Sequence, residues 1–376
     1  MTDRLKDILT TITFLLIVGI LFLLCLISPP KEVSESERRP LAQFPELEWN
    51  KVLSASVMKD FSKAASDQLP FRDEFRGLKA IFNNNVLMLD DNNGFYKHED
   101  YIAKNEYRMS KPDINKVTKI MNAINKKLLS DGNHNIIVSL IPDKNHFLYK
   151  DSGHLGLDYE NFKDYFYSSL EFESKKAEVE PLLEIEDYYY TDTHWRQEKI
   201  VDIAKSIVEG FGREYVGSQF TVLPLEDFKG VYAGQSALPY EKETLYYLTN
   251  KTMENCKVQY MDANADWIDT KLYPIEQFTS MDQYNVFLNG PQGLITIENP
   301  ENTTGNQLVV FRDSFGSSIS PLFAESYSKV ILIDLRYVET MFLDKLISFS
   351  PDADVLFLFS TLAINSSDTF NSSITR

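Results

Sequence analysis

The pattern of hydrophobic and polar positions begins with an uninterrupted apolar run. It extends from Ile8 to Ile27 and contains no charged side chain. A helix of about 20 apolar residues spans the hydrocarbon core of a bilayer, so we expect a transmembrane anchor at residues 8–28. A cleaved signal peptide is the alternative interpretation. The anchor is favoured because the run is long for such a peptide and no small-x-small cleavage site follows it.

Positive charge beside this run predicts its orientation. Arg4 and Lys6 precede it, and the acidic residues near them contribute little to membrane topology. We therefore expect residues 1–7 to form a cytoplasmic tail and the main domain of a single-pass cell-membrane protein to lie outside the cell. Two prolines follow the run and end the predicted helix. Residues 29–85 are predicted to form a charged stalk with docking helices, one of them at residues 51–66.

Beyond residue 85 the pattern is that of an α/β domain. Apolar residues at helical spacing predict a helix from Asp113 to Ser130, and the apolar run Asn135–Ile141 predicts a strand buried on both faces. Toward the end of the chain, apolar runs alternate with helical patterns, which predicts a parallel sheet with right-handed crossovers. The predicted elements there are strands at Gln307–Phe311, Val330–Leu335 and Val355–Phe359 and helices at Pro321–Tyr327 and Thr340–Ser348.

The segment between these two regions has a different character. Short runs of β-forming residues at 245–248 and 257–260 predict strands that are separated by loops. We therefore expect one α/β domain over residues 86–376, with a β-rich insertion at 210–305 placed on its core.

Charge and composition exclude several classes of function. The formal net charge is −17, and the charged residues before the apolar run cancel, so the acidic excess lies beyond the membrane segment. An acidic surface repels phosphate backbones, so no nucleic acid is expected as a partner. Cys25 lies within the apolar run and Cys256 is the other cysteine, so no internal disulfide is expected. No pair of the five histidines has the spacing of a zinc-binding helix, and we expect neither a metal nor a cofactor.

A serine nucleophile is predicted where the strand at residues 307–311 ends. That strand leads into a polar turn with Ser314 at its tip. A serine hydroxyl is a poor nucleophile at neutral pH and needs an adjacent base, which in turn needs an acid that fixes its tautomer. His194 and Asp192 stand two residues apart and would supply the base and the acid. We therefore predict a catalytic triad of Ser314, His194 and Asp192.

A simpler interpretation of the two earlier residues is structural. Asp192 or Thr193 would cap a helix predicted through residues 200–207, and His194 would then be a histidine without a role. The strand–helix–strand units toward the end of the chain favour the catalytic interpretation, because they place the serine turn at the edge where open α/β sheets bind ligands.

Pro321 limits where the helix after the serine can begin. A helix that started directly after Ser314 would be broken or kinked at this proline. We predict instead that Pro321 lies in the first helical turn with Ser320 as its cap, so that Ser314 lies in a loop. Gly316 would then allow backbone N–H groups near Ser314 and Phe315 to point toward an oxyanion.

Polar residues also follow the other predicted strands. Lys144 comes after the strand at 135–141, Arg336 after the strand at 330–335, and Asn365 after the last strand. Open α/β sheets bind ligands at the carboxyl ends of their strands. The three residues are therefore candidates for substrate binding, with Asn365 as a helper at the oxyanion, although a solvated loop lysine is the commoner outcome for Lys144.

At these residues the sequence resembles the DHHW-motif proteins, which are relatives of the alginate O-acetylation proteins in the SGNH hydrolase superfamily. The Asp-His-His-Trp motif of the family stands here as Asp192-Thr193-His194-Trp195. Other similar stretches are spread over most of the chain beyond the apolar run. They are Glu37–Pro45, Asp67–Asp73, Ile141–Lys144, Tyr284–Pro291, Phe311–Ser318 and Ile333–Tyr337.

The resemblance implies a three-layer α/β/α SGNH-like domain in permuted order, with the Asp and His before the serine. It places the catalytic serine in the segment Arg312–Phe315 and the acid and base in the motif. Arg312, Phe315 and Trp195 flank these residues and are candidates for oxyanion or substrate binding. The resemblance also implies a polysaccharide substrate and a multi-pass membrane O-acyltransferase that brings the acetyl group across the membrane.

Three functions follow from these expectations. The first is a membrane-anchored O-acetyltransferase of a cell-surface or exported polysaccharide. The second is a polysaccharide deacetylase or esterase that uses the same triad with water as the acceptor. The third is a non-catalytic polysaccharide-binding protein on the same fold.

Overall fold

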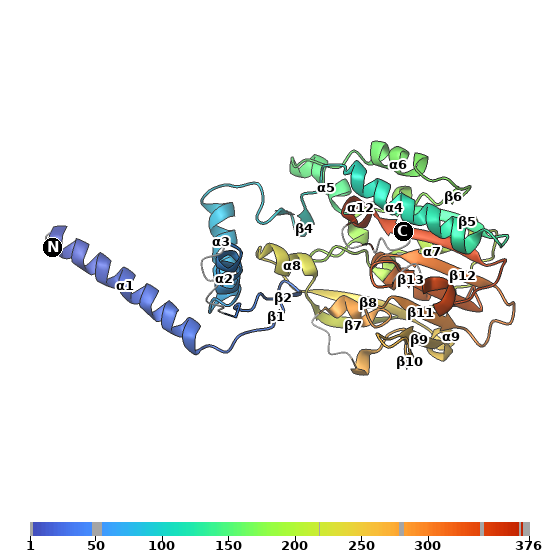
Figure 1. Ribbon diagram of the computed structural model, residues 1–376. Coiled ribbons are helices and arrows are strands. Elements are labelled where there is room, and N and C mark those ends of the chain that lie inside the picture. Colours follow the sequence, from blue (N-terminus) through green and yellow to red (C-terminus); the bar gives the residue numbers. More distant parts are fainter. Residues whose placement is uncertain are drawn as a thin grey trace. The chain divides into compact units, whose positions relative to one another are not determined.

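The computed structural model describes residues 3–46, 55–217, 219–277, 282–338, 342–367 and 370 (Figure 1). The chain divides into two compact units. The first comprises Met1–Asn93 with Ala233–Pro239, and the second comprises Gly94–Tyr232 with Tyr240–Arg376.

The first unit contains the apolar helix and two amphipathic helices. Helix α1 (Asp3–Ile27) includes the whole apolar run and is long and apolar enough to cross a membrane, as a signal sequence or a single anchor would be. Helices α2 (Ala55–Asp67) and α3 (Arg72–Asn85) follow, and strand β1 (Val33–Ser34) pairs antiparallel with β2 (Arg39–Pro40). Residues 51–54 of the helix predicted at 51–66 lie outside the described residues.

A mostly parallel sheet organises the second unit. In the described part of the chain its strand order is β10-β9-β11-β13-β12-β14-β5-β6. The strands from β13 to β6 pair in parallel, and β11, β9 and β10 extend one edge antiparallel. The strands are β5 (Asn135–Ile141), β6 (Lys175–Lys176), β9 (Lys257–Met261), β10 (Trp267–Thr270), β11 (Leu294–Glu298), β12 (Gln307–Arg312), β13 (Lys329–Asp334) and β14 (Asp354–Ser360).

Helices and two hairpins complete the second unit. The hairpins pair β3 (Phe95–His98) with β4 (Tyr101–Lys104) and β7 (Thr221–Phe228) with β8 (Glu243–Thr249). The α-helices are α4 (Lys111–Ile124), α5 (Asn145–Ser152), α6 (Tyr159–Ser168), α7 (Val201–Gly210), α9 (Lys251–Asn255), α10 (Phe315–Ile319), α11 (Leu343–Leu346) and α12 (Thr361–Asn365). Helix α8 (Val231–Ser236) begins in the second unit, and its residues from Ala233 belong to the first. Short 3₁₀ turns lie at Glu180–Leu182, Ile185–Asp187, Gln197–Lys199, Ile275–Gln277, Gln283–Val286 and Ser320–Phe323.

Two hydrophobic cores lie on opposite faces of the sheet because successive side chains of a strand point to opposite sides. On β12, Val310 joins the core that includes Ile207 of α7, whereas Val309 joins the core that includes Ile120 of α4. Figure 1 shows α4 and α6 along one face of the sheet. The continuous apolar composition of β5, β12, β13 and β14 follows from this burial on both faces, and the predicted α/β class is confirmed.

Three sequence-based expectations need correction. The strands of the 210–305 region are not all placed on the core, because β9, β10 and β11 continue the main sheet itself. The helix predicted at Asp113–Ser130 ends as an α-helix at Ile124 and continues as a π-helical turn at Asn125–Leu129. The helix predicted at Thr340–Ser348 is observed only at Leu343–Leu346, and residues 339–341 lie outside the described residues.

The chain after Ser314 also differs from the prediction. Helix α10 begins directly at Phe315, and Ser314 stands at its N-cap position rather than in a loop. Pro321 does not break α10, because this helix ends at Ile319. The proline is the second residue of the 3₁₀ turn Ser320–Phe323, where it removes no α-helical hydrogen bond. The residue before this 3₁₀ turn is Ile319 and not the predicted cap Ser320.

Candidate active site

Strand β12 carries Ser314 to the carboxyl edge of the parallel strands. After Arg312 the chain turns through Asp313 and Ser314 into α10. The buried carboxylate of Asp313 fixes this turn. Its Oδ1 accepts the N–H of Phe315 (3.0 Å), and its Oδ2 accepts the N–H (2.8 Å) and the Oγ–H (2.6 Å) of Ser360. Since Ser360 ends β14, the serine turn is tied to the neighbouring strand of the sheet.

His194 meets this serine from a segment 120 residues earlier in the chain. Its Nε2 lies 2.7 Å from Ser314 Oγ, and its Nδ1 lies 2.6 Å from Asp192 Oδ1. An ionised carboxylate only accepts hydrogen bonds, so Nδ1 carries the proton and Nε2 is left to accept the serine hydroxyl. Asp192 and His194 are buried, whereas Ser314 is partly exposed. The three predicted residues therefore lie in one line of hydrogen bonds.

The carboxylate of Asp192 is fixed by a second segment of the chain. Its Oδ1 also accepts the N–H of His194 (3.1 Å), and its Oδ2 accepts the N–H of Val231 (2.7 Å). Gly230 makes this approach possible, because a Cβ there would lie 2.2 Å from the carbonyl of Thr191 and 2.3 Å from the nitrogen of Asp192. Sequence reasoning missed Gly230, since a single glycine in a loop carries no signal of what it packs against.

Neither Asp192 nor Thr193 caps the helix predicted through residues 200–207. Helix α7 begins at Val201 with Ile200 at its N-cap, after the 3₁₀ turn at Gln197–Lys199. The hydroxyl of Thr193 instead accepts a hydrogen bond from the Tyr232 O–H at 2.8 Å. The alternative interpretation, in which Asp192 only caps this helix, is therefore wrong.

Tyr284 supports the imidazole from its face. The two rings stack with centroids 3.8 Å apart and an interplanar angle of 5°. The Tyr284 O–H donates to Ser318 Oγ in α10 (2.8 Å), and burial raises the pKa of this hydroxyl well above its ordinary value, so it stays a donor. Sequence reasoning did not select Tyr284, although the stretch 284–291 was among those similar to the family. One aromatic residue among many gave no sign of which ring it would face.

Trp195 joins the histidine segment to the helix after the serine. Its indole N–H donates to the Phe315 carbonyl (3.1 Å) and to Ser318 Oγ (2.9 Å), and its side chain is fully buried. In this position Trp195 is a positioning group and is not open to substrate, contrary to its prediction as a binding candidate.

Two of the predicted oxyanion donors, at Phe315 and Asn365, are engaged elsewhere. The N–H of Phe315 donates to Asp313 Oδ1, as described above. Both hydrogens of the Asn365 amide are also used, because Nδ2 donates to Glu106 Oε1 and to the Arg108 carbonyl, each at 2.7 Å. Its Oδ1 accepts the N–H of Ser110 at 2.7 Å. Asn365 therefore fixes the segment that enters α4 and is not directed at Ser314.

The two predicted arginines share one buried carboxylate. Arg336 donates from Nε and Nη2 to the two oxygens of Asp334 (2.9 and 2.7 Å), and Arg312 Nη1 lies 3.7 Å from Asp334 Oδ2. Arg312 is almost fully buried, and its Nη1 donates to Ser317 Oγ at 2.7 Å. Burial lowers the pKa of this guanidinium from its ordinary value. Gly316 provides room for it, because a Cβ there would lie 2.7 Å from Arg312 Cβ.

Lys144 supports the chain just before the motif. Its buried ammonium donates to the carbonyls of Tyr189 (2.8 Å) and Tyr190 (3.0 Å). Burial lowers the pKa of Lys144 to about 7, while burial raises the pKa of its neighbour Asp143 to about 7. Lys144 thus holds the segment that leads into Asp192 and is not a solvated loop lysine.

A run of unusual backbone lies at the same edge of the sheet. Leu288, Asn289 and Gly290 have φ of 57°, 62° and 74°. They precede β11, whose first residue Leu294 pairs with Ile333 near the carboxyl end of β13. Consecutive residues in the left-handed region are costly and tend to persist at functional sites. The turn predicted from Asn289-Gly290 is thus present, and it lies on the side of the sheet that carries Ser314.

The arrangement supports activated-serine chemistry. A base 2.7 Å from the hydroxyl accepts its proton as the oxygen attacks, and the buried carboxylate stabilises the imidazolium that forms. Within the described ranges, no group of three or more His, Cys, Asp or Glu side chains is placed to hold a metal ion.

Comparison with known proteins finds one matching family model. Residues 163–333, which contain both Asp192–Trp195 and Ser314, match the family model described as DHHW protein. No curated protein matches the chain.

Solved structures share the architecture. A DHHW family protein from Eubacterium siraeum matches with a TM-score of 0.56 at 19% identity, over 75% of this chain and 95% of that one. Bacillus cereus PatB1 matches with a TM-score of 0.59 at 20% identity, over 74% of this chain and 98% of that one. The O-acetyltransferase domain of Pseudomonas putida AlgJ matches with a TM-score of 0.43 at 11% identity, over 72% and 92%. At these identities, the first two likenesses establish the fold alone.

Proposed function

Because residues 163–333 of this chain belong to the DHHW family, we propose that the protein is a membrane-anchored O-acetyltransferase of a cell-surface or exported polysaccharide. The observation that carries the proposal is the line of hydrogen bonds from Ser314 Oγ through His194 to Asp192, with distances of 2.7 and 2.6 Å. The domain is proposed to be SGNH-like in permuted order, because the acid and base precede the nucleophile in the chain.

The first half of the reaction forms an acetyl-serine. Ser314 Oγ attacks the carbonyl carbon of an acetyl donor while His194 Nε2 takes the hydroxyl proton. The tetrahedral intermediate then collapses, the bond to the leaving group breaks, and His194 returns the proton to that group. Asp192 stays ionised throughout and holds the imidazolium through Nδ1.

The second half transfers the acetyl group to a sugar. A sugar hydroxyl replaces the leaving group, gives its proton to His194 Nε2 and attacks the acetyl-serine. The bond to Ser314 Oγ breaks as the imidazolium returns the proton to the serine. The product is an O-acetylated sugar, and the enzyme is regenerated without a cofactor.

Of the oxyanion donors first predicted, only the backbone N–H of Ser314 is kept in the proposal. Phe315 N–H and the Asn365 amide are engaged with Asp313 and with the 106–110 segment. We assign the N–H of Ser314 itself as one donor, because it is attached to the nucleophile and lies beside the attacked carbon. A donor of this kind typically lowers the barrier by about 3 kcal/mol.

The location and the partner follow from α1. An apolar helix of this length supports a single-pass anchor with residues 1–7 in the cytoplasm and the second unit outside. Such an anchor would keep the acetyl-serine site close to a multi-pass membrane O-acyltransferase that supplies the acetyl group from inside the cell.

A direct assay separates the transferase from its alternatives. The full chain in detergent is incubated with an acetyl ester and a series of oligosaccharides, and the products are identified by mass spectrometry. An acetylated oligosaccharide that disappears with Ser314→Ala supports the proposal. Free acetate alone supports an esterase, and binding of the oligosaccharide without either product supports a non-catalytic role. Ser168→Ala, at an exposed position on α6, is the matched control.

A further inference from the structure

Helix α3 carries an apolar stripe that no described part of the chain covers. Phe71, Phe75, Leu78, Phe82 and Val86 follow one another at spacings of three and four residues, which places them on one side of the helix. Their exposed fractions range from 41% for Phe75 to 62% for Leu78. Soluble surfaces rarely expose so many large apolar side chains in one row, so the stripe marks a surface that is covered in the working protein.

The opposite side of α3 is already in use. Ala80 is fully buried, and Arg76 donates to the carbonyls of Gly234 and Gln235, each at 2.9 Å. Asn83 Nδ2 donates to Asn92 Oδ1 at 2.9 Å. The helix is thus fixed to its own unit through its polar face, and this attachment directs the apolar stripe away from the unit.

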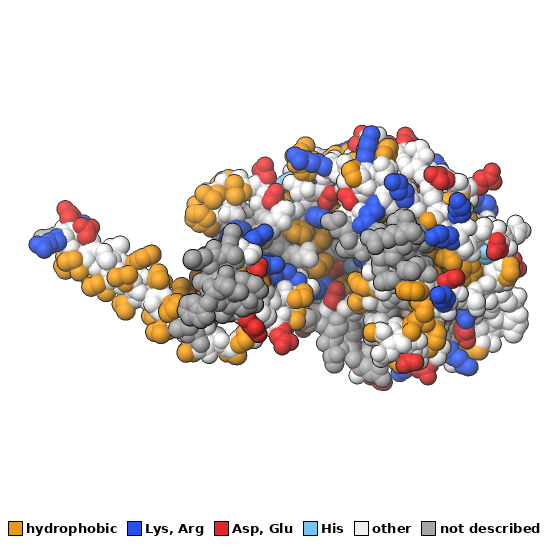
Figure 2. All heavy atoms as spheres, in the orientation of Figure 1, with side chains coloured by type: hydrophobic (Ala, Val, Ile, Leu, Met, Phe, Trp, Pro, Cys, Tyr) orange, Lys and Arg blue, Asp and Glu red, His pale blue; other side chains and the backbone are white. Residues whose placement is uncertain are grey.

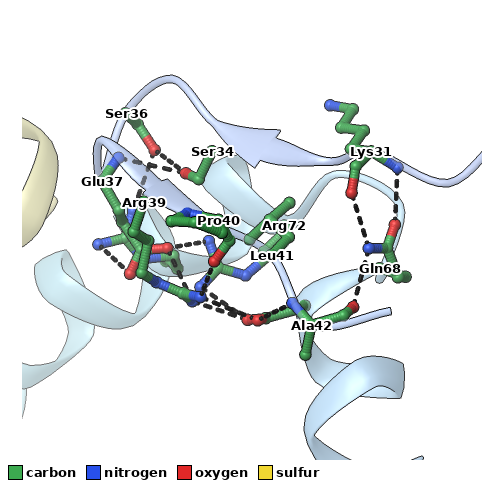
Figure 3. A network of polar contacts seen from close by, with 12 residues as sticks. Lys31, Ser34, Ser36, Glu37, Arg39, Pro40, Leu41, Ala42, Gln68 and Arg72 are labelled. Atoms are coloured by element: carbon green, nitrogen blue, oxygen red, sulfur yellow. Dashed lines mark hydrogen bonds and ion pairs between the residues drawn. The ribbon is translucent and has the colours of Figure 1, made fainter. Parts of the chain in front are cut away.

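A short connection ties this helix to the end of α1. Lys31 stands four residues after Ile27, and its N–H donates to Gln68 Oε1 (2.8 Å) while Gln68 Nε2 donates to the Lys31 carbonyl (2.9 Å), as Figure 3 shows. Four residues extend at most about 14 Å. Gln68 lies three residues before Phe71, so the stripe begins within a short reach of the end of α1.

Ion pairs make this connection rigid. Arg39 binds Asp67 through two hydrogen bonds of 2.9 and 2.7 Å. Arg72, at the start of α3, contacts Asp67 and also Glu37, and Figure 3 labels Arg39, Arg72 and Glu37 in this network. The hydrogen bonds from Arg39 are the largest cause of a pKa shift at Asp67, and they hold the pKa of this carboxyl well below its usual range. The network joins the segment after α1 to the junction of α2 and α3.

The distribution of charge agrees with a location beside the membrane. Residues 28–93 contain nine Lys and Arg against eleven Asp and Glu, whereas residues 94–376 contain 27 against 42. The acidic excess, which an anionic lipid surface would repel, therefore lies almost entirely beyond the segment that carries the stripe.

We propose that the apolar stripe of α3 lies in the headgroup and upper acyl region of the same membrane that α1 spans. Amphipathic helices with aromatic residues on the apolar face bind at this depth, and the polar layer of a bilayer is about 5–7 Å thick on each side, within reach of the connection through Lys31. The inference rests on the anchor proposed above. It means that the protein contacts the membrane at two points rather than through a single flexible stalk.

Site-directed spin labels on the full chain test this proposal. In a Cys25→Ser and Cys256→Ser background, single cysteines at Leu78 and Phe82 report on the stripe. Ile17→Cys in α1 is the bilayer reference, and Lys126→Cys, exposed in the second unit, is the aqueous reference. The labelled chains are reconstituted in phosphatidylcholine vesicles, and collision with oxygen and with a water-soluble nickel chelate is measured. Each altered side chain is exposed, so no buried contact is removed except in the shared cysteine background.

The expected result is protection of both stripe labels from nickel by at least about threefold relative to the Lys126 label, with raised collision with oxygen. Protection at Ile17 without protection at Leu78 and Phe82 would overturn the docking while leaving the anchor and the enzyme proposal intact. Exposure of Ile17 as well would overturn the anchor and the docking together. Dipolar broadening between labels on neighbouring chains would assign the stripe to a second copy and reject the membrane as its occupant.

Discussion

The imidazole of His194 lies flat against the ring of Tyr284, with the ring centroids 3.8 Å apart and 5° between the planes. Asp192 holds the same imidazole at its edge through Nδ1. The ring is therefore restrained both in rotation and in tilt, and Nε2 remains directed at Ser314 Oγ. Preorganisation of this kind matters because displacements of about 1 Å can reduce a rate 10²-fold.

Tyr284→Leu is expected to lower kcat by about 10- to 100-fold with little change in KM, because the imidazole loses the surface that orients it. Tyr284→Phe keeps the stacked ring and loses only the hydrogen bond to Ser318, so it should retain most of the activity. Circular dichroism checks that both variants are folded. Equal activities of Leu, Phe and Tyr at this position would show that the stacking has no role in catalysis.

Asp192→Asn should lower kcat by about 10³- to 10⁴-fold. An amide at this position can present an N–H to His194 Nδ1, which favours the tautomer with the proton on Nε2 and removes the acceptor for the serine. Kinetics with an acetyl ester measures the loss. Activity within a few-fold of the natural protein would exclude the assigned role of Asp192.

Gly230→Ala is expected to impair catalysis from outside the triad. The added Cβ would collide with the backbone of Thr191 and Asp192 at 2.2 to 2.3 Å, and the Val231 N–H would be displaced from Asp192 Oδ2. A fall in kcat of at least about tenfold is predicted. The matched control is Gly77→Ala, where a Cβ meets nothing within 4 Å. If both variants behave alike, the close approach at Gly230 is not what orients the carboxylate.

Much of this architecture could be predicted from sequence because burial on both faces leaves a distinct pattern. The strand β5 was predicted with the bounds observed, β12 differs by one residue at one end, and β13 and β14 differ by one residue at each end. In contrast, β9 and β10 are partly exposed, and β10 forms the edge of the sheet, so their composition did not reveal that they join the main sheet. Short edge strands depend on pairing rather than on their own hydrophobicity.

The candidate site residues fall into two groups, those selected by their chemistry and those selected by their position in the sequence. Ser314, His194 and Asp192 could be selected because the chemistry requires those residue types together. Lys144, Asn365 and Trp195 were selected by position at the ends of strands or beside the motif, and the structure engages each of them with backbone carbonyls of the protein. A sequence names the end of a strand but does not say whether a polar side chain there points toward the site or back into the fold.

Asp143 is predicted to make folding stability depend on pH. Its pKa is raised to about 7 by burial, from 3.8 in the unfolded chain, so the folded state holds the proton over a range in which the unfolded state has lost it. The contribution of Asp143 to the free energy of unfolding is fully present below its pKa in the unfolded chain. It decreases as the pH rises toward 7, by up to about 1.4 kcal/mol per pH unit.

Asp143→Asn removes this titration while keeping an oxygen for the N–H of Asn145, which Asp143 Oδ1 accepts at 2.6 Å. Urea unfolding of both chains between about pH 5 and pH 6.5 should show the natural protein losing stability relative to the variant as the pH rises. Because Lys144 is present in both chains, its own titration cancels to first order. Parallel pH profiles would contradict the assignment.

The most direct measurement is covalent capture of the acetyl-enzyme. The full chain is mixed with a chromogenic acetyl ester without a sugar acceptor, quenched in acid, digested and examined by mass spectrometry. Natural protein should carry one acetyl group on the peptide that contains Ser314, and His194→Ala should accumulate it at least about 10³-fold more slowly. Absence of the acetyl group from Ser314, or its equal appearance in His194→Ala, would contradict the account of an activated serine.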